Sequence, residues 1–195
     1  LAEDYSAIPN PYLLDTTGLS ASGKSCVSGS MAAELGLIRL RSDVERKRLF
    51  GLGPLDQSKS PTGEKLYTEE GNQRTYERLA KLAGALLTSG LPVIVDSACL
   101  KQSEREMMAD VAESRGMPFA LLHCEAPLES RKEWARNRTG DASEATEEFL
   151  EEQEAWLEPL TTDEKTHTIH LYTDQEHVGE AVADRIRQHF GLPGM

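Results

Sequence analysis

The chain has 195 residues, which suits one substantial α/β domain or at most two small ones. Its 33 acidic and 21 basic residues give a formal net charge of −12, which argues against a broad electrostatic attraction to nucleic acid or to anionic membranes. No apolar run approaches the ~18 residues of a membrane span, and the first residues lack the basic and apolar pattern of a signal peptide.

Short apolar runs alternate with helical patterns along the chain, which predicts a βαβ protein. The run Pro92–Asp96 is apolar without alternation, as central strands of parallel sheets are. Thr68 is predicted to cap a long helix that Gly90 ends. The five predicted strands are Tyr12–Thr16, Leu37–Leu40, Pro92–Asp96, Phe119–Cys124 and Thr168–Tyr172. The predicted helices begin near Gly23, Arg41, Thr68, Ser103 and Glu176.

Five strands with interleaved helices predict a doubly wound, mostly parallel sheet with helices on both faces, a three-layer α/β sandwich. We expect this domain to span residues 12–195. The charged, mostly helical segment at about 127–160 is expected to form a lid. Residues 1–11 are expected to be a tail or the end of a linker from an upstream domain.

One segment between the first strand and the first helix carries a complete phosphate-binding motif. Gly18–Ser25, with the sequence GLSASGKS, matches G-x-x-x-x-G-K-[ST] in full. Glycines let consecutive backbone N–H groups curl around phosphate oxygens, and the helix that follows directs its N-terminal donors at the same anion. Lys24 is expected to contact the β- and γ-phosphates, and Ser25 to ligate Mg²⁺. The expected phosphate-binding residues are Gly18, Ser20, Ala21, Ser22, Gly23, Lys24, Ser25 and Cys26.

The motif predicts a nucleotide site without naming the reaction. The chain shows no guanine-reading Asn-Lys-x-Asp element and no transporter signature, and it is short for a mechanical ATPase. Small P-loop kinases are therefore the leading class, and nucleotide-binding switches are the second.

Two aspartates are candidates for the acceptor side of the site. Asp43 follows the second strand and is the predicted general base, with Arg46 one helical turn later for an anionic group. Asp96 ends the third strand, where a carboxylate can hold a Mg²⁺-bound water or orient the acceptor. The phosphate-binding motif Gly18–Ser25 is the P-loop, and the strand Tyr12–Thr16 leads into it. We expect each aspartate to end a strand that lies next to this one. The alternative is that Asp43 is a helix N-cap and that the basic residues after it form a solvated face.

Arginines in the charged segment are candidate lid residues. Arg131, Arg136 and Arg138 could close on the phosphates and stabilise the charge of the transferred group. The alternative for each of them is a place on a solvated helix.

Cysteine and histidine patterns add no further site. Cys26, Cys99 and Cys124 form neither a disulfide framework nor a zinc spacing, so we interpret them as small buried side chains in a reducing, cytoplasmic location. The five histidines form no metal-binding motif, and we expect structural or surface roles for them.

Four strings in order, GLSASGKS, SDVERKRLFGL, PVIVDSACL and NRTGDASEAT, resemble the predicted P-loop kinases that occur alone or fused behind an aminoglycoside-phosphotransferase-like domain. The layout is more distantly similar to polynucleotide 5′-hydroxyl kinases, zeta-toxin-like kinases, chloramphenicol phosphotransferases and gluconate kinases. In the polynucleotide kinases an Asp-x-x-Arg holds the base and a phosphate-contacting arginine, which Asp43 and Arg46 match. The resemblance also implies an acceptor-site role for Asp96 and a phosphate-contacting role for Arg136 or Arg138.

The sequence as a whole predicts an ATP- and Mg²⁺-dependent kinase that phosphorylates a hydroxyl of a small molecule. The residues expected to be catalytic are Asp43, Lys24, Arg46, Asp96 and Arg138. Ser25 and Asp96 are the residues expected to bind the metal. The alternatives are a nucleotide or polynucleotide 5′-hydroxyl kinase, and a non-catalytic ATP-binding module for a partner domain. The acidic charge disfavours a long nucleic-acid substrate.

Overall fold

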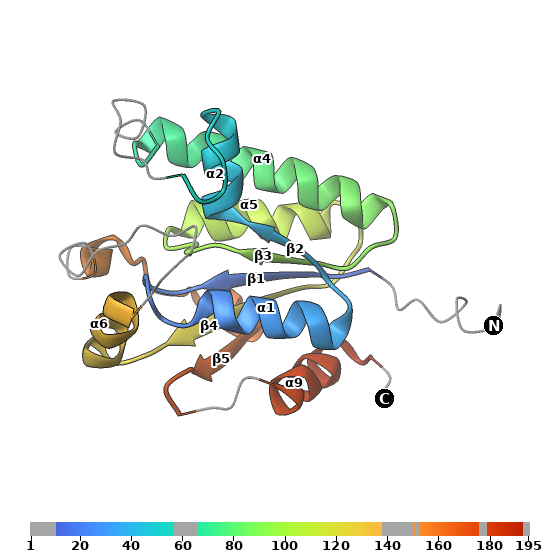
Figure 1. Cartoon of the computed structure of the whole chain (residues 1–195). Coiled ribbons are helices and arrows are strands. Elements are labelled where there is room, and N and C mark those ends of the chain that lie inside the picture. Colours follow the sequence, from blue (N-terminus) through green and yellow to red (C-terminus); the bar gives the residue numbers. More distant parts are fainter. Residues whose placement is uncertain (1–10, 57–65, 138–149, 151–152, 176–178, 193–195) are drawn as a thin grey trace.

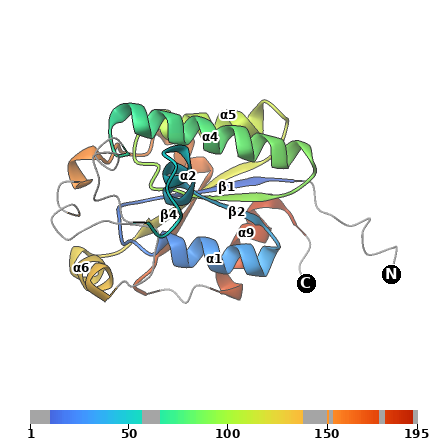
Figure 2. The same ribbon diagram turned by 45° about the horizontal axis from the view of Figure 1, so that its top comes forward.

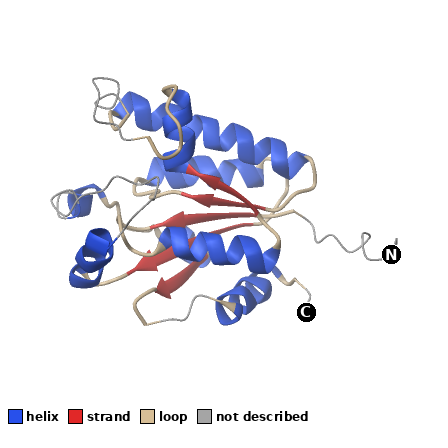
Figure 3. Cartoon of the chain, viewed as in Figure 1, coloured by secondary structure: helices blue, strands red, loops and turns tan. Residues whose placement is uncertain are grey.

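The computed structural model describes residues 11–56, 66–137, 150, 153–175 and 179–192. Its centre is one five-stranded sheet in the order β2-β3-β1-β4-β5, and every neighbouring pair is parallel (Figures 1 and 3). The strands are β1 (Leu13–Thr17), β2 (Ile38–Arg41), β3 (Val93–Asp96), β4 (Phe119–Glu125) and β5 (Thr168–Tyr172). The predicted parallel sheet is therefore confirmed, and each predicted strand differs from the observed one by no more than a residue at either end.

Helices cover both faces of the sheet, which confirms the three-layer sandwich (Figure 2). The described helices are α1 (Lys24–Leu35), α2 (Ser42–Leu49), α4 (Glu69–Thr88), α5 (Gln102–Glu113), α6 (Leu128–Asn137), the 3₁₀ turn η2 (Gln153–Trp156), α8 (Thr162–Thr166) and α9 (Glu180–Phe190). Among them, none combines the length and the apolar character that crossing a lipid bilayer requires.

Two apolar cores lie on opposite faces of the sheet and meet at β1. Leu14 packs with α1 and α9 side chains such as Met31 and Ile186. Leu13 points the other way and packs with α4 and α5 side chains such as Leu79 and Met108. All five residues of β1 are buried, so buried and exposed side chains do not alternate along it, as is typical of a central strand in a parallel sheet.

Local sequence explains several element boundaries. The Thr68 side chain accepts a hydrogen bond from the Gly71 amide at 3.1 Å, so the predicted N-cap of α4 is confirmed. α1 ends at Gly36, whose φ of 65° is the left-handed conformation that glycine adopts without steric cost.

One topological expectation was wrong. β2 pairs with β3 and is separated from β1 by it, so only Asp96, and not Asp43, follows a strand next to the P-loop strand. Asp43 also lies within the first turn of α2, which begins one residue earlier, at Ser42. The two residues still reach the same edge of the sheet, because all the strands point toward that edge.

Candidate active site

The P-loop connects the carboxyl end of β1 to α1 and depends on two glycines. Gly18 has a φ of 140°, and a Cβ built there would lie 2.3 Å from the Cys124 carbonyl oxygen of β4. Gly23, with a φ of 81°, is the N-cap of α1. Ala21 also has a positive φ, of 60°, which is uncommon outside glycine. The backbone between these residues is thereby curled in the way a phosphate cradle requires.

Side chains of the α1 N-terminus turn back onto this loop. Lys24 Nζ donates to the carbonyl oxygens of Gly18 at 2.8 Å and Leu19 at 2.6 Å. Ser25 Oγ donates to Asp96 Oδ1 at 3.4 Å, so the loop hydroxyl and the β3 carboxylate face one another. Cys26 is exposed, so the expectation that all three cysteines are buried was wrong for this one. It lies on the first turn of α1, beside the loop, whereas Cys99 and Cys124 are within the cores.

Two arginines of β2 hold the Asp96 carboxylate. Arg39 Nη2 donates to Asp96 Oδ2 at 2.6 Å and to the Ser25 carbonyl at 2.7 Å, and Arg41 Nε lies 3.3 Å from Asp96 Oδ2. Asp96 itself is 6% exposed. Two guanidinium groups thus hold the Asp96 carboxylate beside the Ser25 hydroxyl as an oxygen donor.

Asp43 lies half-buried in the first turn of α2, close to the same charges. Burial raises the pKa of this carboxyl, and Asp96 raises it further, while Arg46, Arg41 and Lys24 oppose the rise. These interactions bring Asp43, Asp96 and Lys24 into one electrostatic environment. A carboxylate with a raised pKa in such a place can accept a proton at neutral pH.

Arg46 has structural partners in the described chain. Its buried guanidinium donates through Nη1 to the Leu66 carbonyl at 2.9 Å and to Asn72 Oδ1 at 2.6 Å, and it lies over the Tyr67 ring. It therefore ties α2 to the N-terminus of α4. Its predicted contact with an anion stays a prediction.

The three arginines predicted to belong to a lid differ from one another in their surroundings. Arg131 in α6 is 3% exposed, and its Nη2 contacts Glu154 Oε1 of η2 at 2.5 Å. Its Nε and Nη1 are buried without a hydrogen-bond partner among the described residues. Arg136 is exposed in the last turn of α6, and Arg138 lies outside the described residues. η2 also reaches the P-loop, because Gln153 Oε1 accepts from the Ser20 amide at 2.5 Å.

A buried polar network joins the end of β1 to the residues after β3. Thr16 Oγ1 donates to the Ser97 carbonyl at 2.8 Å, and Thr17 Oγ1 donates to the Cys99 carbonyl at 2.9 Å. Asp15 Oδ1 accepts from Ser97 Oγ at 3.0 Å. The network fixes the start of the P-loop relative to Asp96.

Sequence reasoning missed Arg39, Arg41, Gln153 and Asp15. Arg39 and Arg41 had a readable signal, since the strand IRLR places two arginines on the same side of a strand that ends at the ligand edge. Gln153 had none, because its contact spans 133 residues of sequence. A carboxylate within an apolar strand, as at Asp15, is itself a signal, since buried charges are rare without a partner.

A family comparison matches this arrangement along most of the chain. The model of the family AAA_33, described as an AAA domain, matches residues 13–160, from the first residue of β1 to beyond η2. The chain belongs to the AAA_33 family. Its domain is a kinase-like P-loop domain, which confirms the predicted resemblance to P-loop small-molecule kinases at the level of the domain.

Two curated relatives of this AAA_33 domain are similar over part of their length. An adenylyl-sulfate kinase of Myxococcus xanthus is 29% identical over 123 residues, which are 60% of this chain and 60% of that protein. A UPF0200 protein of Aeropyrum pernix is 31% identical over 140 residues, which are 69% of this chain and 70% of that protein. The chain thus spans less than two thirds of the length of the M. xanthus enzyme.

Solved structures share the fold of the AAA_33 domain over nearly the whole chain. A sugar kinase from Janibacter superposes with a TM-score of 0.68 at 24% identity, covering 93% of this chain and 95% of that one. The APS kinase CysC of Mycobacterium tuberculosis, in complex with AMPPNP and APS, superposes with a TM-score of 0.64 at 20% identity, covering 94% and 99%. At these identities the likeness concerns the fold.

Proposed function

We propose that the chain is an ATP- and Mg²⁺-dependent kinase that transfers the γ-phosphoryl group of ATP to a hydroxyl of a small-molecule acceptor. The observation that carries the proposal is the meeting of three oxygen groups at one edge of the sheet. The Ser25 hydroxyl of the P-loop faces Asp96, and Asp96 acts electrostatically on Asp43. In this proposal, the carboxyl end of the sheet brings together the phosphate-binding loop, the metal-binding oxygens and the general base.

The residues present fit the phosphates and the metal. The backbone of Gly18–Ser25 curls without room for a Cβ at Gly18, and α1 starts at its end, so backbone donors and the helix dipole both favour an anion. Two buried nitrogens of Arg131, Nε and Nη1, have no partner among the described residues and are suited to donate to an anion as well. Ser25 Oγ and Asp96 Oδ1 are hard oxygen donors of the kind Mg²⁺ prefers, directly or through water. Mg²⁺ bound there would neutralise charge on the β- and γ-oxygens.

Each residue can then be given a task in the transfer. Lys24 gives up its contacts with the Gly18 and Leu19 carbonyls and donates to phosphate oxygens. Asp43 accepts the proton of the acceptor hydroxyl as that oxygen bonds to the γ-phosphorus and the bond from the γ-phosphorus to the β-phosphate oxygen breaks, which releases ADP. The raised pKa of Asp43 favours holding the proton. Arg39 holds Asp96 in place beside Ser25 through its contacts with the Asp96 carboxylate and the Ser25 carbonyl.

A small acceptor is favoured over a long nucleic acid for two reasons. The net charge of −12 opposes a polyanion, since polynucleotide binding draws most of its affinity from basic side chains. Structures with this fold also include a sugar kinase and an APS kinase in complex with APS. Sugars, nucleosides and nucleotide-like small molecules are therefore the acceptors to test first.

The test is an ATP-consumption screen of the full chain with sugars, aminoglycosides, nucleosides and 5′-hydroxyl oligonucleotides as acceptors. Turnover with a small molecule that disappears in Lys24→Ala would support the proposal, because the lysine contacts the ligand and not the core. Turnover only with the oligonucleotides would replace it with a polynucleotide kinase. Tight ATP binding with no turnover in any acceptor class would favour a non-catalytic module.

Once an acceptor is known, two conservative variants separate the roles of the aspartates. Asp43→Asn keeps the size of the side chain but cannot take a proton, so kcat should fall ~10²–10⁴-fold with nearly unchanged Mg²⁺-ATP affinity. Asp96→Asn should also weaken the apparent affinity for Mg²⁺ or for the acceptor. Wild-type turnover in Asp43→Asn together with an inactive Asp96→Asn would reverse the assignment.

A further inference from the structure

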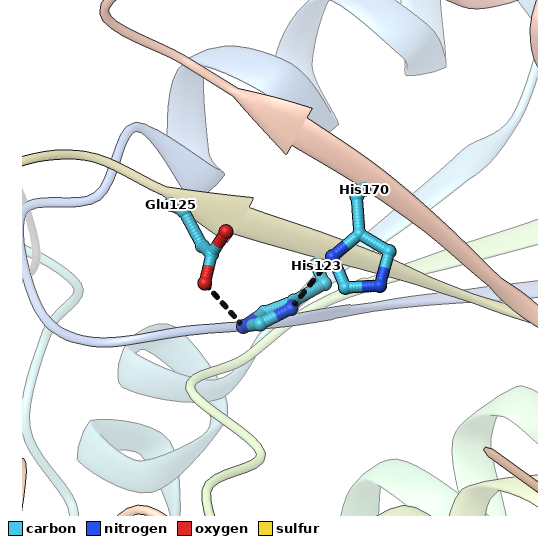
Figure 4. Close-up of side chains that lie close together, drawn as sticks. All are labelled: His123, Glu125 and His170. Atoms are coloured by element: carbon cyan, nitrogen blue, oxygen red, sulfur yellow. Dashed lines mark hydrogen bonds and ion pairs between the residues drawn. The ribbon is translucent and has the colours of Figure 1, made fainter. Parts of the chain in front are cut away.

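Two histidines and a glutamate gather on the sheet away from the P-loop helix. His123 and Glu125 lie on β4, and His170 lies on β5 (Figure 4). One ligand atom from each of the three lies within 4.8 Å of the other two. The histidines are 47 residues apart in sequence, so no sequence motif announces the group.

The register of the sheet creates this cluster. β4 and β5 are parallel, and His123 is aligned with His170 across the pair. Glu125 follows His123 by two residues, and side chains two apart in a strand share a face. The register of the two strands therefore places the three residues next to one another on one face of the sheet.

The cluster is open to solvent at β5, the outermost strand of the sheet. β5 is the edge strand, and its residues alternate, with Ile169 and Leu171 buried and His170 exposed. Glu125 is 46% exposed at its side chain, whereas His123 is 13% exposed. An ion can thus reach the cluster, and His123 is the most buried of the three ligands.

The distances suit a transition metal. His123 Nδ1 and His170 Nδ1 are 3.2 Å apart. Two Zn–N bonds of about 2.05 Å at a tetrahedral angle place their nitrogens roughly 3.3 Å apart. Glu125 Oε1 lies 3.9 Å from the other ring nitrogen of His123, and its exposed side chain can move toward the metal. Two imidazoles that face each other through the same nitrogen must share either a proton or a cation.

We propose that His123, His170 and Glu125 bind a divalent transition-metal ion of the Zn²⁺ class, in a site separate from the proposed Mg²⁺ position at Ser25 and Asp96. Imidazole ligands select Zn²⁺, Ni²⁺ or Cu²⁺ over Mg²⁺, which prefers six oxygens. Three protein ligands leave one position of a tetrahedral ion for water.

Metal binding at this site would affect the P-loop through β4. The single hydroxyl proton of Thr173 is shared between two carbonyl oxygens, that of Glu125 at 3.0 Å and that of Ser22 at 2.9 Å. The Cys124 carbonyl is the atom that leaves no room for a Cβ at Gly18. A metal that clamps β4 to β5 therefore stiffens the strand against which the loop rests.

The test is a ZnCl₂ titration of the full chain by calorimetry, in excess Mg²⁺ so that oxygen sites are filled. A Cys26→Ser background removes the exposed thiol as a competing ligand. We expect one Zn²⁺ per chain and a rise in melting temperature on binding. His123→Gln, His170→Gln and Glu125→Gln should each weaken binding at least ~10-fold.

The matched control is His167→Gln, an exposed histidine one residue before β5, which should leave the affinity unchanged. Equal Zn²⁺ affinity in wild type, His123→Gln and His170→Gln would overturn the site, as would equal weakening by His167→Gln. An unaffected Glu125→Gln would overturn the third ligand. If His123→Gln does not fold, the exposed His170→Gln decides the question alone.

Discussion

At the scale of single residues, Asp15 is an unusual side chain for the centre of a sheet. It is fully buried, and its Oδ2 has no hydrogen-bond partner among the described residues. Burial raises the pKa of this carboxyl from 3.8 to about 7, against the opposing influence of the Cys99 and Ser97 side chains. The folded protein therefore retains a proton here that the unfolded chain releases at a much lower pH.

This difference predicts a pH-dependent loss of stability. The protonated Asp15 favours the folded state fully below pH 3.8, and the advantage is lost as the pH rises through about 7. Asp15→Asn keeps the bond to Ser97 and removes the titration. Urea unfolding between pH 5 and 8 should show the variant gaining stability over wild type as the pH rises. Asp110→Asn, at an exposed position of α5, should follow the wild-type curve, and the same behaviour in Asp15→Asn would contradict the assignment.

Gly18 gives a second prediction at this scale. A Cβ there would lie 2.3 Å from a backbone oxygen, and the φ of 140° is one that side chains rarely adopt. Gly18→Ala should cost ~1–3 kcal/mol of unfolding free energy and weaken nucleotide binding, because the loop must move from β4. Gly179→Ala, with nothing within 4 Å of its Cβ, is the control. Melting curves and a nucleotide-analogue titration measure both effects, and equal stability of the two variants would refute the steric argument.

At the scale of elements, α5 is tied to the chain beyond η2 by one buried arginine. Arg105 is 1% exposed, and its Nε lies 2.5 Å from Glu164 Oε1 of α8. It also donates to the carbonyls of Leu100 and Glu158. Burial alone would raise the pKa of Glu164, but hydrogen bonds from Arg105 and Thr161 outweigh it and hold that pKa below its usual value.

Breaking this tie should be costly. Arg105→Gln leaves Glu164 and two carbonyls without their cation, and we expect a loss of ~3 kcal/mol in unfolding free energy. The loss should shrink as the pH falls through the lowered pKa of Glu164, since the protonated carboxyl no longer needs the arginine. Denaturant unfolding at pH 7 and at acidic pH measures both effects. Lys81→Gln, at an exposed position of α4, should change little; a comparable loss there would show that general charge matters more than this pair.

The elements also show what the sequence could predict. β3 was foreseeable because it is a short, buried apolar run, and β5 because its apolar and polar residues alternate. α4 was foreseeable because Thr68 caps a long apolar stripe. The order of the strands was less accessible. Nothing local in residues 37–41 tells that β2 pairs with β3 and not with β1, since that pairing depends on how the crossovers pack.

The candidate site also has a part that the sequence predicts and a part that it does not. The P-loop could be predicted because its function requires a fixed local spacing of glycines, lysine and serine. The pair of Arg39 with Asp96 joins residues 57 apart, and the pair of His123 with His170 joins residues 47 apart. Such pairs arise from sheet register, which becomes visible only once the strands are assembled.

At the scale of the whole molecule, the two cores should unfold together because they share β1. Leu13 and Leu14 are each 0% exposed and face opposite cores. Leu13→Ala and Leu14→Ala should each cost ~2–5 kcal/mol. Both variants should keep a single unfolding transition, and hydrogen exchange should accelerate in α1 and in α4 alike. Loss of protection confined to the helices on the mutated side would indicate two independently folding halves.

The exposed thiol of Cys26 has a practical consequence. The other two cysteines are buried, so a maleimide reagent should attach at one point of the native chain, next to Ser25. The proposed phosphate position lies beside that point, and a bound nucleotide should slow the alkylation. The rate of labelling then reports how many P-loops are occupied, and it does so before any acceptor has been identified.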